Sequence, residues 1–239
     1  KYKKNQIINA ENSGTLGRLI LGLLVKSPFK IKIIGDKSLS KRDFSRVTIP
    51  LEKFGVTFDY KSENKLPLSI LGSQSIKDIN YFEKRGSAQC KSSIMLAALN
   101  ASGTTFIKAK KSRNHSELLF KYLKIPIKIK KTKKYDFINI RKPKKIKAFN
   151  YQIPGDISSS AFFIVLTMLA NDSKLLIKNV NINPSRMGAI TILKKMGAKI
   201  YLKNKKNYKG EKISDILIRS SNNLKSINCP SELNSSAID

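Results

Sequence analysis

Acidic residues are scarce in this chain: 16 Asp and Glu stand against 47 Lys and Arg among 239 residues, which gives a formal net charge of +31. Such a charge is typical of proteins that bind nucleic acids or membrane surfaces, so a basic nucleic-acid-binding module is one hypothesis. Only eight of the 47 basic residues are arginine, the side chain that best matches phosphates and base edges. A solvated lysine surface is therefore the simpler interpretation, and we expect no nucleic-acid partner.

Metal ligands and long apolar runs are also scarce. The chain has one histidine, His115, and two cysteines, Cys90 and Cys229, which form no CxxC pair. This excludes a zinc knuckle and a disulfide scaffold, and we expect no metal and no cofactor. The apolar runs at 19–25 and 161–170 are shorter than the roughly 20 residues that span a bilayer, and no signal peptide opens the chain. We expect a cytoplasmic protein without a membrane partner.

Hydrophobic residues make up 41% of the chain, which is enough for a folded body with one large domain or two ordinary ones. The chain begins with Lys1 in place of an initiator methionine and stops at Asp239 soon after a loop. We interpret it as an internal segment of a longer protein.

A repeat of about 70 residues is the most informative pattern. Three segments change from helical to alternating apolar spacing, which predicts a helix that runs into a strand. They start at Ile49, Leu119 and Thr191, 70 and 72 residues apart. Three others, each a small polar start followed by an apolar helix and a strand, begin at Gly14, Ser87 and Gly155. We predict an α/β chain of repeated helix–strand–loop–helix–strand units, with further strands at 66–73, 136–141 and 215–220.

The loop within each repeat carries an arginine: Arg42, Arg113 and Arg186 follow one another at intervals of 71 and 73 residues. The first helix of each repeat also starts with small polar residues, and a helix N-terminus offers free N–H groups to an anion. Capping and solvation would explain any single copy. Three copies in one register favour the binding of a small polyanion.

Six motifs stand in order along the chain: Asn12–Thr15 with Arg18 (NSGT…R), Gly35-Asp36 with Lys41-Arg42, Ser87–Ser92 (SAQCKS), Ser112–Glu117 (SRNHSE), Pro154–Phe163 (PGDISSSAFF) and Asn183–Gly188 (NPSRMG). Together they resemble the motifs of the 5-enolpyruvylshikimate-3-phosphate synthase (3-phosphoshikimate 1-carboxyvinyltransferase) family. A sister family, UDP-N-acetylglucosamine enolpyruvyl transferase, has the same fold but lacks the SAQxKS and SRxH(S/T)E strings, and it is the closer alternative.

The resemblance implies an α/β (α+β) fold of two domains, each built from repeated βαβαββ units around a pseudo-threefold axis. Residues 1–153 would form the first domain, incomplete at its start, and residues 154–239 part of the second. We expect a monomer. Cys90 stands where the family usually has valine, so we expect it in the core.

The resemblance also implies an activity: transfer of the enolpyruvyl group of phosphoenolpyruvate to the 5-hydroxyl of shikimate 3-phosphate, with release of phosphate, in aromatic amino-acid biosynthesis. Asp239 would be the catalytic proton acceptor. The residues implied to contact shikimate 3-phosphate are Ser87, Ala88, Gln89, Ser112 and Arg113. Those implied to hold phosphoenolpyruvate are Asn12, Gly14, Arg42 and Gln89.

Some residues depart from the family pattern. Glu11 and Asp43 replace the usual glycine and proline of the first two motifs, and both changes fall beside the implied phosphoenolpyruvate site. The family's Lys-Ser…Arg and Lys-Glu…Asp-Arg motifs are absent, so we expect this chain alone to be inactive. For His115 we expect a structural role, and for Asp156 a helix cap.

Overall fold

The computed structural model describes residues 2–237. Their contacts divide the chain into two units. Unit 1 holds the residues up to Ser112 and residues 123–146; unit 2 holds residues 113–122 and the chain from Lys147 onward. The expected domain boundary at 153/154 stays a prediction, and the placement of 113–122 in unit 2 is a feature that the sequence did not indicate.

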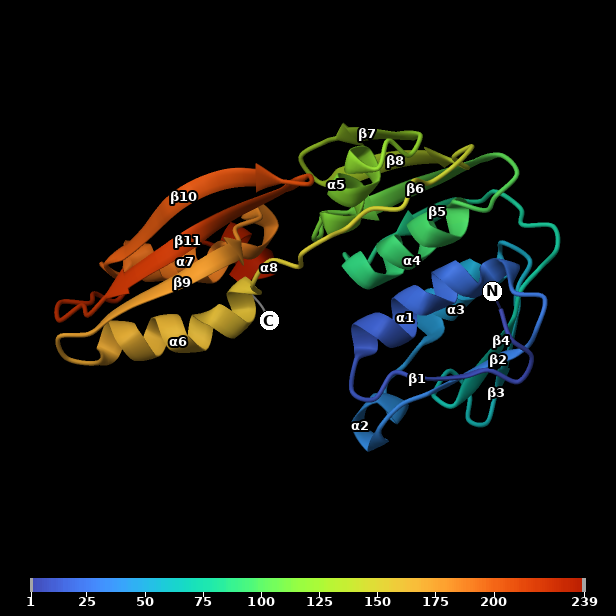
Figure 1. The fold of residues 1–239 in the computed structure, drawn as a ribbon, viewed down its shortest axis with the longest axis horizontal. Helices are drawn as coiled ribbons and strands as arrows, with labels where there is room; N and C mark the ends of the chain where they lie inside the picture. Colours follow the sequence, from blue (N-terminus) through green and yellow to red (C-terminus); the bar gives the residue numbers. More distant parts are fainter. Residues whose placement is uncertain (1, 238–239) are drawn as a thin grey trace. The chain divides into compact units, whose positions relative to one another are not determined.

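Unit 1 contains two four-stranded sheets with one topology (Figure 1). The elements of the first sheet and its helices are β1 (Ile7–Asn9), α1 (Gly14–Leu23), the 3₁₀ turn η1 (Leu24–Lys26), β2 (Ile31–Ile34), α2 (Lys37–Ser40), α3 (Ser45–Glu52), β3 (Thr57–Tyr60) and β4 (Leu68–Leu71). Those of the second are β5 (Asn80–Glu83), α4 (Ala88–Ala98), β6 (Thr104–Lys110), β7 (Ile127–Lys131) and β8 (Tyr135–Arg141). The strand orders are β1-β2-β4-β3 and β5-β6-β8-β7, and in each sheet only the first pair is parallel. The two copies agree with the predicted repeat.

Unit 2 repeats the pattern in a reduced form. Its elements are α5 (His115–Tyr122), α6 (Ile157–Leu169), β9 (Lys174–Asn181), η2 (Pro184–Arg186), α7 (Gly188–Lys195), β10 (Ile200–Tyr208), β11 (Glu211–Arg219), η3 (Ser231–Leu233) and α8 (Asn234–Ala237). The three strands pair in the order β10-β11-β9, and a single parallel bridge from Gly155 to Val180 takes the place of a first strand. The helix–strand pairs therefore fall where the sequence predicted them, and the mixed α/β class is confirmed. The pseudo-threefold arrangement stays a prediction.

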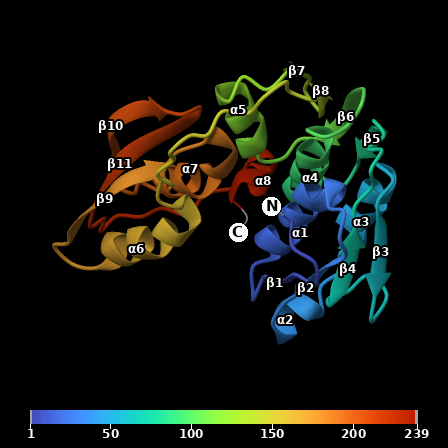
Figure 2. The same cartoon turned by 45° about the vertical axis from the view of Figure 1, so that its right-hand side comes forward.

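Helices α1, α3 and α4 pack together in unit 1, and Figure 2 shows α1 beside α4 from a second direction. Their contact requires a glycine: a Cβ on Gly22 would lie 2.2 Å from the carbonyl oxygen of Ser93. The hydroxyl of Ser93 donates to the carbonyl oxygen of Arg18 at 3.1 Å. The backbones of α1 and α4 therefore approach each other closely, and side chains at their N-terminal ends can contact one another.

The three long helices begin as the sequence predicted. Ser13, Ser87 and Asp156 cap α1, α4 and α6, each accepting a hydrogen bond from the backbone N–H three residues on. Cys90 lies on α4 with 2% of its surface exposed, which confirms it as a core residue. No helix among residues 2–237 is long and apolar enough to cross a bilayer.

Candidate active site

A buried arginine joins the ends of α1 and α4 in unit 1. Arg18 is 5% exposed, and its Nη1 donates to Oε1 of Gln89 at 2.9 Å. Its Nη2 donates to the carbonyl oxygen of Asp43 at 3.3 Å. The amide of Gln89 donates in turn to Oγ1 of Thr15 at 2.9 Å. Two helix starts more than 70 residues apart in sequence are thereby fixed against each other.

Gly14 lies at the centre of this group, with little space beside it. A Cβ at Gly14 would lie 2.8 Å from Nη1 of Arg18 and 3.4 Å from Nη1 of Arg42. Any larger residue would push against two guanidinium groups. The start of α1 therefore packs directly against two positive groups, Arg18 and Arg42.

Positive charge dominates this end of unit 1. Burial lowers the pKa of Arg18, and the charges of Arg46 and Arg42 lower it further, while Asp43 opposes them. Like charges held this close favour an anion between them. The arrangement has the electrostatics of an anion site.

The two acidic groups nearby are engaged in fixing loops. Asp36 accepts from Nδ2 of Asn12 at 2.6 Å and from the N–H of Leu39 at 2.7 Å, which caps α2. The bond from the Leu39 N–H, followed by that from Asn12, holds the pKa of Asp36 below its usual range. Asp43 accepts from both the N–H and the hydroxyl of Ser45 at 2.7 Å. These carboxylates order the loop that carries Arg42.

The start of α4 rests on a buried carboxylate that sequence reasoning missed. Glu83 ends β5 with 3% of its surface exposed, and it accepts the N–H groups of Arg85, Gly86 and Ser87 at 3.1, 2.7 and 3.0 Å. This shapes the turn that places Ser87, Ala88 and Gln89. The only signal in the sequence is an acidic residue three positions before a glycine.

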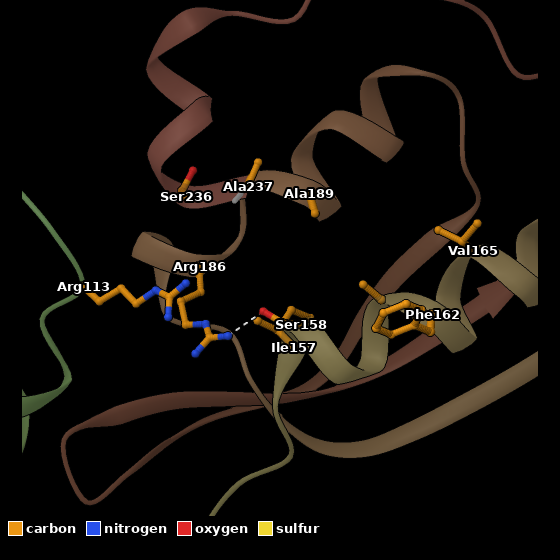
Figure 3. A pocket seen from close by; sticks show the side chains of 10 residues that line it. Arg113, Ile157, Ser158, Phe162, Val165, Arg186, Ala189, Ser236 and Ala237 are labelled. Carbon is orange, nitrogen blue, oxygen red and sulfur yellow. Dashed lines mark hydrogen bonds between the residues drawn. The ribbon is translucent and has the colours of Figure 1, made fainter. Parts of the chain in front are cut away.

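A second candidate region lies in unit 2, where a cavity of about 330 Å³ has an arginine end and an apolar wall (Figure 3). The arginine end is formed by Arg113, Arg186 and Ser158. Nη2 of Arg186 donates to Oγ of Ser158 at 2.5 Å and lies 2.8 Å from Oδ1 of Asp156. Residues on the apolar wall include Ile157, Phe162 and Val165. This cavity could take an anionic group together with an apolar body.

The predicted site residues fall into two groups. Those that the structure brings together at the ends of α1 and α4 are Asn12, Gly14, Arg42, Ser87, Ala88 and Gln89. Ser112 follows β6 in unit 1, and its hydroxyl is buried without a hydrogen-bond partner among the described residues. Arg113 counts with unit 2, where it lines the cavity. Asp239 lies outside the described residues.

The sequence predicts structural roles for Asp156 and His115, and the structure shows the contacts of both. Asp156 caps α6 by accepting from the Ser159 N–H at 3.2 Å, which confirms the prediction. His115 bonds to Glu211, a residue that the sequence gave no reason to select. Among residues 2–237 no three His, Cys, Asp or Glu side chains come together as metal ligands do.

Comparisons with known proteins point to one family. The family model described as EPSP synthase (3-phosphoshikimate 1-carboxyvinyltransferase) matches residues 1–230. A 3-phosphoshikimate 1-carboxyvinyltransferase of Caldicellulosiruptor bescii is 41% identical over 219 residues, which are 91% of this chain and 50% of that protein. One of Hydrogenovibrio crunogenus is 40% identical over 239 residues, 99% of this chain and 54% of that protein.

Solved structures give the same result. The EPSP synthase of Acinetobacter baumannii superposes with a TM-score of 0.82 at 36% sequence identity, over 98% of this chain and 52% of that one. The chain thus spans about half the length of the relatives it matches.

Proposed function

The chain belongs to the EPSP synthase family, and from this premise we propose that it serves the transfer of the enolpyruvyl group of phosphoenolpyruvate to the 5-hydroxyl of shikimate 3-phosphate, with release of phosphate. The observation that carries the proposal is the bond from Arg18 to Gln89, which joins two implied substrate-binding helix ends beside Gly14 and Arg42. The proposed partners are small anions, taken up by a monomer in the cytoplasm that needs no cofactor.

Phosphoenolpyruvate suits the end of α1 in charge and in shape. Its carboxylate and phosphate would face the start of α1, where the helix dipole is positive. The guanidinium of Arg42 can hold such groups with two parallel hydrogen bonds. An anion placed here would also relieve the repulsion among Arg18, Arg42 and Arg46.

Shikimate 3-phosphate is the proposed ligand of the α4 end and of the segment at 112–113. Glu83 holds Ser87, Ala88 and Gln89 in a fixed turn. A buried hydroxyl without a partner is unfavourable, and the Ser112 hydroxyl would gain one from a phosphate oxygen. Arg113, the next residue, would add a charged donor to the same phosphate.

The chemistry needs a proton taken from the attacking hydroxyl and one delivered to the methylene carbon of the enol. A carboxylate can accept the first proton when it lies within hydrogen-bond reach, and Asp239 is the proposed acceptor. Positive groups around the phosphate stabilise the charge that builds on it as it leaves. Arg18 and Arg42 are the proposed source of that stabilisation.

Titration calorimetry on the 239-residue chain tests the proposal. We expect shikimate 3-phosphate to bind, and phosphoenolpyruvate to bind more weakly in Arg42→Gln but normally in Arg219→Gln, a control arginine at the end of β11. Binding of UDP-N-acetylglucosamine without binding of shikimate 3-phosphate would contradict the proposal. So would tight oligonucleotide binding that shikimate 3-phosphate leaves unchanged.

A further inference from the structure

Helix α5 is held in unit 2 by groups distant in sequence. Both strands that flank it, β6 and β7, belong to unit 1, yet residues 113–122 count with unit 2. Arg113, which lines the unit 2 cavity, lies two residues before the first residue of α5. Whatever fixes the first turn of α5 therefore also fixes the arginine.

A buried carboxylate contacts that first turn. Glu211, the first residue of β11, is 6% exposed, and its Oε1 lies 2.5 Å from Nδ1 of His115. Its Oε2 accepts from Nδ2 of Asn183 at 3.2 Å. Asn183 is itself 2% exposed, and it also donates to Oδ1 of Asn114 at 2.9 Å. Glu211 and Asn183 thus hold the two residues that follow Arg113.

The backbone reinforces this contact. Gly210 has φ +92°, and a Cβ there would lie 2.9 Å from the carbonyl oxygen of Leu118 on α5. The turn between β10 and β11 therefore touches the helix directly, and only glycine fits that position. This turn has little conformational freedom, and it places Glu211, the next residue, against His115.

The charge of Glu211 matters as well as its position. Burial acts to raise the pKa of Glu211, but the hydrogen bond from His115, the charge of His115 and bonds from Asn181 and Asn183 hold it below its usual range. An ionised carboxylate requires a hydrogen on Nδ1 of His115. Stability alone does not explain a buried ionised carboxylate, because an apolar residue of similar size often stabilises a protein equally well.

We propose that Glu211 is a positioning residue: together with Asn183 it fixes the first turn of α5 and so holds Arg113 at the arginine end of the cavity, beside Arg186 and Ser158 (Figure 3). The proposal rests on the proposed function in one respect, namely that Arg113 is a ligand of the substrate phosphate. The anchoring of α5 by Glu211 can be tested without any ligand.

His115 is the only histidine of the chain, so the nitrogen NMR spectrum of its imidazole contains one pair of ring signals. We expect Glu211→Gln to shift the Nδ1 signal and to speed amide exchange at residues 113–116 by about tenfold or more. Asp215→Asn is the matched control. It removes one carboxylate from the same strand, where Asp215 accepts from Asn179 and Asn204 instead of α5. We expect it to change neither signal nor exchange.

Affinity for shikimate 3-phosphate supplies the second measurement. A small misplacement of a binding group can weaken binding by about ten- to a hundredfold, and we expect such a loss in Glu211→Gln but not in Asp215→Asn. His115→Asn breaks the same contact from the α5 side, and we expect it to reproduce the loss. It keeps the test valid if Glu211→Gln does not fold.

The outcomes separate the two proposals. Unchanged ring signals and exchange in Glu211→Gln would overturn the positioning role, and so would faster exchange with undiminished affinity. If the unaltered chain does not bind shikimate 3-phosphate, the proposed function fails; faster exchange confined to 113–116 would still support the anchoring of α5, and unchanged exchange would refute it.

Discussion

Helices α4 and α6 open equivalent repeats, yet their apolar residues meet different surroundings. On α4, Ile94 and Met95 are fully buried, in a unit where α1 and α3 pack against the helix. On α6, Phe162 is 80% exposed and Leu166 is 66% exposed in the described chain. Both helices are capped and both precede a strand of the same sheet pattern. The local sequence therefore specifies the helix, whereas burial of its apolar face depends on a neighbouring repeat.

The position of closest helix contact offers the strongest test of this difference. Gly22→Val would drive a side chain into the Ser93 carbonyl, and we expect unit 1 to lose about 3 kcal/mol of unfolding free energy. Ala161→Val on α6 is the counterpart, since Ala161 lines the cavity of unit 2 and has room beside it. We expect a change within about 0.5 kcal/mol there. Urea unfolding followed by circular dichroism measures the loss in each variant. Equal losses would contradict the difference in packing between the two units.

Removing apolar side chains gives the next largest effect. Ile94→Ala leaves a cavity in a closed core, and we expect a loss of about 2 to 3 kcal/mol. Leu166→Ala takes away a side chain that is already largely in solvent, and we expect a loss within about 0.5 kcal/mol. Urea unfolding followed by circular dichroism measures both losses. A large loss at Leu166 would mean that α6 is covered.

We expect the loss of a helix cap to lower the unfolding free energy by a similar amount on α4 and on α6, because a cap acts locally. Ser87→Ala and Asp156→Ala each remove an acceptor for a helix N–H, and we expect about 1 kcal/mol from each. Asp156 also pairs with Arg186, so Asp156→Asn serves as a control that keeps the cap and weakens the ion pair. Very different losses of unfolding free energy in Ser87→Ala and Asp156→Ala would show that packing also affects the helix ends.

Acid should act on unit 2 through Glu211, with the smallest effect of the four. Its pKa is lower in the folded protein than the usual value of 4.5, so its contribution to stability is present above that value. The contribution is lost as pH falls below 4.5 through the folded pKa. Unfolding at pH 7 and at acidic pH should therefore show a decline in the unaltered chain that is smaller in Glu211→Gln. Parallel declines would contradict this origin.

The repeated elements could be predicted because their signals are local. Apolar periodicity marked α1, α4 and α6 with the strands that follow, and small polar residues marked their caps. The strands β1 and β5 were missed, since each precedes the helix with which the predicted repeat unit begins. Their positions depend on parallel pairing with β2 and β6, which sequence reading cannot see.

The candidate site was predictable in part for a different reason. Resemblance to family motifs selected Gly14, Arg42 and Gln89, and the structure places them together. Glu83 escaped selection because the strand that it ends, β5, was itself missed. Glu211 escaped selection because its role arises from a tertiary contact. Glu211 meets His115 across 96 residues of chain, and nothing around either residue indicates the other.

The bond from Arg18 to Gln89 has a consequence for the order in which the molecule is made. It joins residues 71 positions apart, so this contact between α1 and α4 cannot form while only the first repeat has been synthesised. Closing so long a loop comes late relative to the formation of each helix. An anion bound there would favour the finished pair of helices over either one alone.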